Sequence, residues 1–227
     1  MTIRAKLYAA IVLTVLGPLA TTGVALHGMS QMGDRFDEVR QRAQHESLAR
    51  ELKFQVTDMN GWQTAYGYAG GPLRARFVAS AGELRRQLDQ ASRTLTEGRE
   101  RALVAGLQDE FDSFMRLDAV AWRRLQAGDQ ARTRAILLGP ELKRFETMAA
   151  TAERLAGYEE SQAADSESAF NDARDDARRR LVAVALGAAV VIILLLVTAN
   201  DIARMALEGE RSVRARPSRD PESGGSA

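Results

Sequence analysis

Residues 181–199 read LVAVALGAAVVIILLLVTA, an apolar run without a single charged side chain. A membrane-spanning helix needs about 20 predominantly apolar residues, and in lipid every backbone amide must be satisfied within the segment itself. This stretch therefore predicts a transmembrane helix. A second uncharged run, LYAAIVLTVLGPLATTGVAL at residues 7–26, predicts another, and Pro18 within it is tolerable in a membrane helix and can kink it.

A cleaved signal peptide is the alternative interpretation of residues 7–26. Arg4 and Lys6 would supply the basic start that such peptides have. The apolar run is longer than a usual signal core, however, and no clean cleavage site of small residues precedes His27. These two features favour a retained span.

The distribution of basic residues predicts that residues 1–6 and 200–227 are both cytoplasmic. Basic residues precede the first span, and five arginines follow the second: Arg204, Arg211, Arg214, Arg216 and Arg219. Residues 178–180, also arginines, lie on the opposite side, but long translocated segments weigh little in this rule. We therefore expect residues 27–180 outside, and a short tail whose last part, 217–227, is disordered.

The segment 27–180 is expected to be an antiparallel four-helix bundle. Glycine and proline interrupt it at 70–72, 98, 128 and 139–140, and between these breaks apolar residues recur three or four apart. The outer helices, 28–70 and 140–180, would reach roughly 60 Å and the inner two roughly 40 Å. The four apolar stripes are Leu48, Leu52, Met59, Trp62, Tyr66, Ala69; Leu73, Phe77, Leu84, Leu88, Ala91, Leu95; Leu103, Leu107, Phe111, Phe114, Leu117, Ala121, Leu125; and Leu142, Phe145, Met148, Ala152, Leu155, Tyr158.

Composition argues against several classes of function. The chain has 31 Lys and Arg against 30 Asp and Glu, so no basic excess points to nucleic acid. It has no cysteine, its two histidines, His27 and His45, stand alone in the sequence, and no HExxH spacing occurs. We therefore expect no catalytic residues, no cofactor and no metal site. The pairs at 159–160 and 175–176 are expected to be solvated charges.

Polar and aromatic side chains gather near the end of the first outside helix. Asp58, Trp62 and Tyr66 are spaced four apart and share one ridge, and Asn60 and Gln63 share a neighbouring ridge. We interpret them as a ligand pocket with aromatic walls and orienting polar groups. Arg74, across the predicted hairpin, is a further candidate because it can hold an anion, as can its neighbour at position 76. The alternative is that the two aromatic residues simply continue the bundle core.

Two motifs resemble the sensory half of bacterial methyl-accepting chemotaxis receptors. Residues 58–66, DMNGWQTAY, are similar to the D-x-N-x-W-Q-x-A-Y string of many such receptors with a four-helix-bundle ligand-binding domain. Residues 125–129, LQAGD, followed by Ala131, Ala135 and Leu137, are similar to the Gly-Asp turn between their third and fourth helices. The resemblance in layout covers residues 1 to about 205.

The resemblance implies a homodimer in the bacterial cytoplasmic membrane that binds a small extracellular ligand and signals inward. In the family, the second span leads to a HAMP relay and a long signalling coiled coil, whereas only residues 200–227 follow it here. We therefore expect a truncated receptor, or a subunit that acts through a separate cytoplasmic signalling protein. The alternatives are the input half of a split sensor kinase and a membrane scaffold that binds no ligand.

Overall fold

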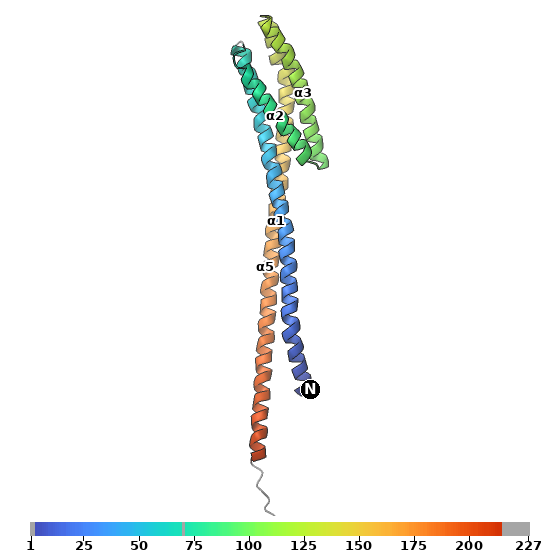
Figure 1. Cartoon of the computed structure of the whole chain (residues 1–227), viewed down its shortest axis with the longest axis vertical. Coiled ribbons are helices and arrows are strands. Elements are labelled where there is room, and N and C mark those ends of the chain that lie inside the picture. Colours follow the sequence, from blue (N-terminus) through green and yellow to red (C-terminus); the bar gives the residue numbers. More distant parts are fainter. Residues whose placement is uncertain (1–2, 70, 215–227) are drawn as a thin grey trace, which may run out of the picture. The chain divides into compact units, whose positions relative to one another are not determined.

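The structure is a computed structural model. It describes the backbone of residues 3–69 and 71–214, and the side chains of residues 12, 17, 19, 21–23, 25–69, 71–200, 203 and 204. Within this part of the chain every regular element is a helix and no strand occurs (Figure 1). The prediction of an all-α protein is confirmed.

Two helices are long and two are much shorter, as the spacing of the glycine and proline breaks predicted. The elements in chain order are α1 (Ile3–Ala69), α2 (Arg74–Thr94), α3 (Gly98–Gln126), α4 (Gln130–Ile136), the π-helical turn η1 (Leu137–Glu141) and α5 (Leu142–Arg214). The chain divides into two compact units, one formed by residues 33–172 and the other by residues 1–32 together with 173–227. We call residues 33–172 the core unit.

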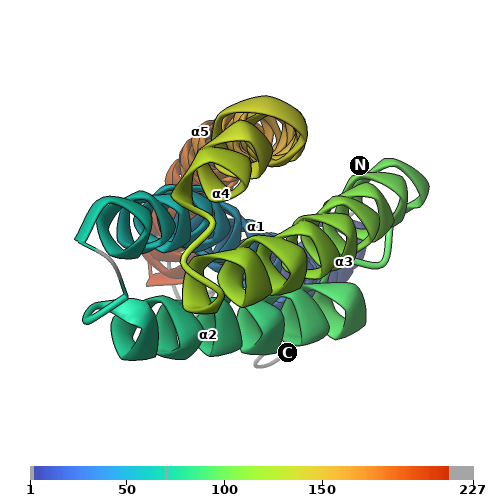
Figure 2. The same cartoon turned by 90° about the horizontal axis from the view of Figure 1, so that it is seen from above.

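Polar contacts define which helices are neighbours in the core unit. Each of four helix pairs is joined by at least one contact between charged or polar side chains, and Figure 2 shows the same helices side by side when viewed from above. These contacts are Gln55–Ser80 for α1 and α2 (2.8 Å), Arg85–Asp112 for α2 and α3 (2.8 Å), Arg144–Glu110 for α5 and α3 (3.1 Å) and Lys53–Glu153 for α1 and α5 (2.5 Å).

One apolar core fills the space among these helices. Most residues of the predicted stripes are buried in it, among them Leu52, Leu84, Leu107 and Leu155, all 0% exposed. Fully burying a leucine or phenylalanine side chain contributes about 1.5–3 kcal/mol, so this shared core holds the unit together. Trp62 is only partly buried and packs against the edge of the core.

Glycines with positive φ shape two of the turns. Gly71 (φ 109°) follows α1, and Gly128 (φ 76°) follows α3, in backbone conformations that side chains with a Cβ rarely adopt. Asp129 then caps α4 by accepting a hydrogen bond from the backbone N–H of Arg132 (3.1 Å), as the Gly-Asp signal indicated. Pro72 lies in the turn before α2 rather than in its first helical turn, because α2 begins at Arg74.

The expected break at residues 139–140 is wrong. The chain stays helical there as the π-helical turn η1, with Pro140 inside it. A proline normally disrupts an α-helix because it lacks an N–H and its ring meets a preceding carbonyl. A π-helical turn uses i→i+5 bonds, occurs as an insertion within α-helices and is frequent at functional sites.

An apolar stretch within Gln130–Asn200 is long and apolar enough to cross a membrane, judged by length and composition. Nothing in the described chain covers this stretch, and Leu186 and Leu196 are 64% and 66% exposed. A helix that is apolar all round and exposed needs an apolar surrounding.

Fewer residues are described towards the two ends of the chain. The backbone of residues 7–26 is helical as part of α1, but many of its side chains lie outside the described residues, so the first predicted span is not tested. Towards the other end, α5 continues without a break to Arg214, so residues 201–214 belong to the same helix. Residues 215–227, which include the predicted disordered end, lie outside the described residues.

Candidate functional site

An arginine–aspartate pair lies at the centre of the predicted site region. Asp118 of α3 is buried, and its two carboxylate oxygens accept hydrogen bonds from the two terminal nitrogens of Arg74 at 2.6 and 2.5 Å. Such a two-pronged, charge-assisted pair is among the strongest polar contacts in proteins. The hydroxyl of Tyr66, on α1, donates a further hydrogen bond to Asp118. The pair thereby joins α1, the start of α2 and α3.

Aromatic rings surround the Arg74 guanidinium. Its central carbon lies 4.7 Å from the ring centre of Tyr66, 4.6 Å from that of Phe77 and 5.0 Å from that of Trp122. A cation is attracted to the face of an aromatic ring at these distances. Burial by itself would lower the pKa of Arg74, but the hydrogen bonds and charge of Asp118 outweigh it and raise the pKa. Arg74 therefore stays charged.

The Tyr66 hydroxyl stays protonated for related reasons. Burial of the side chain raises its pKa above the ordinary value of 10, and the adjacent charge of Asp118 raises it further. A protonated hydroxyl is a donor, which is what the Asp118 carboxylate requires. Tyr66 is itself 0% exposed, so it is part of the core as well as of the polar cluster.

A buried carboxyl without a hydrogen-bond partner lies next to this cluster. Both carboxylate oxygens of Glu141, in η1, and the side-chain nitrogen of Gln63 are buried and unpaired among the described residues. Burial, together with the charge of Asp118, raises the pKa of Glu141 to about 8, although the Gln63 amide and the charge of Arg74 act in the opposite direction. Glu141 is therefore mostly protonated at neutral pH.

A small cavity of about 50 Å³ lies beside Gln63. Asn60 and Gln63 of α1 line it, together with Leu137 and Leu142 from the opposite wall. Pockets for drug-sized ligands usually measure about 300–1,000 Å³, so this cavity has room for only a few atoms. Gly67 also lines it, and a Cβ there would lie 2.5 Å from Leu137 Cδ1, which shows how closely the two walls approach.

The structure separates the six predicted site residues into two pairs and two single residues. Tyr66 and Arg74 meet at Asp118, whereas Asn60 and Gln63 face the small cavity. Asp58 instead accepts a hydrogen bond from the hydroxyl of Ser80 on α2 at 2.6 Å, and that hydroxyl also receives one from Gln55 at 2.8 Å. Trp62 stands apart from these residues. The central guanidinium carbon of Arg76 lies over the Trp62 ring, 4.8 Å from the ring centre.

The sequence analysis missed Asp118 and Glu141, although the pattern contained a signal for both. Asp118 lies four residues after Phe114, and Glu141 four residues before Phe145, so each occupies a core position of its helix. A charged side chain at a core position is either paired or forced to change its pKa. Asp118 is paired with Arg74, and Glu141 has a raised pKa. In the sequence, the only sign of either residue is a charged side chain at a position where the apolar stripe would continue.

A second polar cluster was also missed, at the other end of the core. Glu159, expected to be solvated, is 0% exposed, whereas its neighbour Glu160 is exposed as expected. Its position four residues after Leu155 places it in the core register of α5. There it meets His45 of α1 and Glu100 of α3.

A larger cavity, about 810 Å³, is lined by side chains within residues 23–32 and 173–181 of the other unit. It is open and mostly apolar, and it contains none of the predicted site residues. Its lining ends at Leu181, where the apolar stretch begins, and we do not treat it as the site.

Comparison of the chain with protein-family models, with curated proteins and with solved structures found no match.

Proposed function

We propose that this chain is a membrane-anchored sensor in which a helical outer domain binds a small ligand and moves a membrane helix. The observation that carries the proposal is the continuity of α5, which is one helix from Leu142 to Arg214. Its first part supplies core residues such as Met148 and Leu155, and its later part is the uncovered apolar stretch. A shift of α5 in the core would therefore be a shift of the same helix in the bilayer, and small helix shifts are an established switching mode.

In this proposal, residues 27–180 form a four-helix bundle between two membrane spans. The closed ring of helix neighbours and their shared core support an antiparallel bundle. With spans at residues 7–26 and 181–199, residues 27–180 are extracytoplasmic and both chain ends are cytoplasmic. Together with the motif at 58–66, this layout supports a receptor of the chemotaxis type, a homodimer that passes its signal to a cytoplasmic partner.

Topology can be tested directly because the chain has no cysteine. Single variants Ser92→Cys, on the exposed surface of α2, and Ser218→Cys, in the tail, would be expressed in intact bacterial cells. A membrane-impermeant maleimide should label the first from outside and the second only after lysis. Labelling of Ser218→Cys in intact cells would rule out the two-span arrangement.

We place ligand binding at the end of the core unit that contains Arg74, where Asn60 and Gln63 line the small cavity. The test is a thermal-shift screen of the full chain in detergent micelles against amino acids, organic acids and amines. A ligand that binds only the folded protein raises its melting temperature, visibly at about 100 times the dissociation constant. Asn60→Ala should abolish the rise, and Gln44→Ala, an exposed change on the same helix, should keep it.

A membrane scaffold without a ligand is the second candidate, and the size of the cavity favours it. About 50 Å³ excludes most metabolites, and Arg74 and Tyr66 already have partners in Asp118. The same screen separates the two functions when Trp62→Ala is included. No shift across the panel, with Trp62→Ala strongly destabilised, would identify Trp62 as a packing residue and favour the scaffold.

A further inference from the structure

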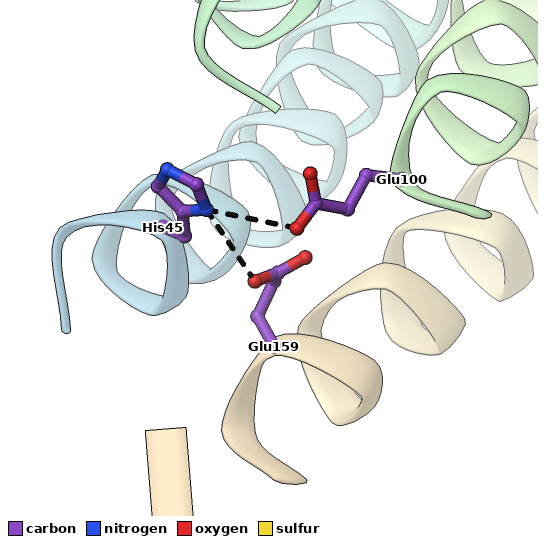
Figure 3. Close-up of side chains that lie close together, drawn as sticks. All are labelled: His45, Glu100 and Glu159. Carbon is purple, nitrogen blue, oxygen red and sulfur yellow. Dashed lines mark ion pairs between the residues drawn. The ribbon is translucent and has the colours of Figure 1, made fainter. Parts of the chain in front are cut away.

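Three ligand-type side chains from three helices converge at the end of the core unit opposite Arg74. Figure 3 shows His45 of α1, Glu100 of α3 and Glu159 of α5 pointing toward one another. The Nδ1 atom of His45 lies 3.6 Å from a carboxylate oxygen of Glu100 and 3.9 Å from one of Glu159. The three ligand atoms all lie within 4.8 Å of one another.

These groups are buried, and three of their polar atoms lack a hydrogen-bond partner among the described residues. Glu100 and Glu159 are 0% exposed and His45 is 5% exposed. Neither oxygen of Glu159 has a hydrogen-bond partner among the described residues, and neither does the Nδ1 atom of His45. Buried carboxylates are normally paired with a cation or hydrogen-bonded, because an unpaired buried charge is costly. The Glu159 carboxylate and the Nδ1 atom of His45, both without a hydrogen-bond partner, face the same point, where both could bind a cation.

We propose that His45, Glu100 and Glu159 bind one divalent transition-metal ion of the Zn²⁺ type. One imidazole nitrogen and two carboxylate oxygens suit such an ion, and three protein ligands leave a position for water. Bonds of about 2.1 Å in tetrahedral geometry place ligand atoms roughly 3.4 Å apart. The observed separations are 3.6 and 3.9 Å from His45 and at most 4.8 Å between the two carboxylates, so side-chain rotations would have to bring the ligand atoms closer by up to about 1.4 Å.

The surroundings hold one of the ligands in place. Glu100 is the third residue of α3, and its second carboxylate oxygen accepts a hydrogen bond from the backbone N–H of Glu97 at 3.0 Å, as part of a capping box. Arg42 donates at 3.3 Å to the oxygen of Glu100 that faces His45, and it also pairs with Glu97. A metal ion would share this oxygen with Arg42 or displace it, whereas the capping hydrogen bond is an outer contact of the kind that orients ligands in known metal sites.

The local charge also favours a cation. Glu97, Glu100 and Glu159 carry three negative charges when ionised, and Arg42 offsets one of them. A divalent ion would neutralise the remaining negative charge.

The consequence for the protein is a link among three helices. Since the ligands come from α1, α3 and α5, a bound ion would join the first and last helices at one level of the core. This inference goes beyond the proposed sensor function and holds for a scaffold as well. We expected no metal site because no metal-binding spacing occurs along the sequence. Such a spacing cannot reveal ligands that come from three separate helices.

The test uses the full chain in detergent micelles, stripped with a chelator and carrying no histidine tag. Binding of Zn²⁺ would be measured by competition with a chromophoric chelator and by elemental analysis of the metal retained after gel filtration. We expect one ion for each chain. His45→Gln and Glu159→Gln should each weaken binding by more than about 100-fold, because even changes to outer contacts cost about 10- to 100-fold.

Two matched controls lie in the same chain. His27→Gln removes the other histidine, and Glu160→Gln removes the exposed neighbour of Glu159, so both should bind Zn²⁺ like the parent. Circular dichroism checks that each variant is folded, and His45→Gln and Glu159→Gln test the site independently. No retained Zn²⁺ at micromolar concentration, undiminished binding by folded Glu159→Gln, or loss of binding in His27→Gln would overturn the proposal.

Discussion

Replacing Glu141 with glutamine should stabilise the protein, and the gain should grow with pH. The pKa of Glu141 rises from the ordinary 4.5 to about 8 because the carboxyl is buried near Asp118. In the unfolded chain it loses its proton near pH 4.5, whereas in the folded chain it keeps the proton until about pH 8. Between these values folding takes up a proton, so the free energy of unfolding falls as the pH rises. Glutamine has nearly the same shape and cannot ionise.

The magnitude follows from the two pKa values. Each unit of difference corresponds to about 1.36 kcal/mol, so the full effect above pH 8 is roughly 5 kcal/mol. At pH 7, where most folded molecules still hold the proton, the effect is about 3 kcal/mol. For a helical unit of this size that is on the order of 10 °C in melting temperature. Below pH 4.5 the carboxyl is protonated in both states, and the effect vanishes.

The assay compares melting temperatures of the parent and Glu141→Gln in detergent micelles from pH 4.5 to 8.5. Other titrating groups, including Glu159, are present in both proteins and cancel in the difference. Glu146→Gln, an exposed change on α5, is the control and should follow the parent at every pH. A melting temperature that drops in Glu141→Gln, or a difference that does not change with pH, would refute the argument that Glu141 is buried without a partner.

Three further changes test the core and its turns. Gly71→Ala should cost about 1–3 kcal/mol, because φ of 109° is strained for alanine and its Cβ would lie 3.1 Å from an aromatic ring of α3; chemical denaturation measures it. Phe114→Ala should cost about 3–5 kcal/mol by opening a cavity, whereas Phe54→Ala, at an exposed position, should change the melting temperature little. Tyr66→Phe removes the hydrogen bond to Asp118 and should cost about 1–2 kcal/mol in the same assay.

Much of the fold could be predicted from the sequence because its signals are local. Glycines at 71 and 128 mark turns through their backbone freedom, and apolar spacing identifies the buried face of each helix. The boundary at Pro140 was predicted wrongly because a proline does not end every helix. A proline ends an isolated α-helix, but here a π-helical turn that lies against α3 accommodates it.

The candidate site was less accessible to sequence reasoning, because its contacts join distant segments. The ridge argument correctly placed Trp62 and Tyr66 near each other along α1. It could not show that Tyr66 turns into the core toward Asp118 while Trp62 packs at the edge under Arg76. Which side of a helix faces a given neighbour depends on the packing of all the helices, and a one-dimensional pattern does not contain that information.

Buried charged residues occupy core positions at the two ends of the helical core, and their placement bears on function. The buried charges lie at its two ends, in the cluster around Asp118 and in the cluster around Glu159, while leucines such as Leu52 and Leu107 fill the middle. Apolar residues at the charged positions would often give equal or greater stability. If the charges only set helix register, Glu159→Leu should leave a folded, more stable protein with unchanged helix pairing and no other loss. If they bind a metal, the same variant should gain stability without Zn²⁺ and lose all stabilisation by Zn²⁺, so comparing its melting temperature with and without the ion separates the two roles.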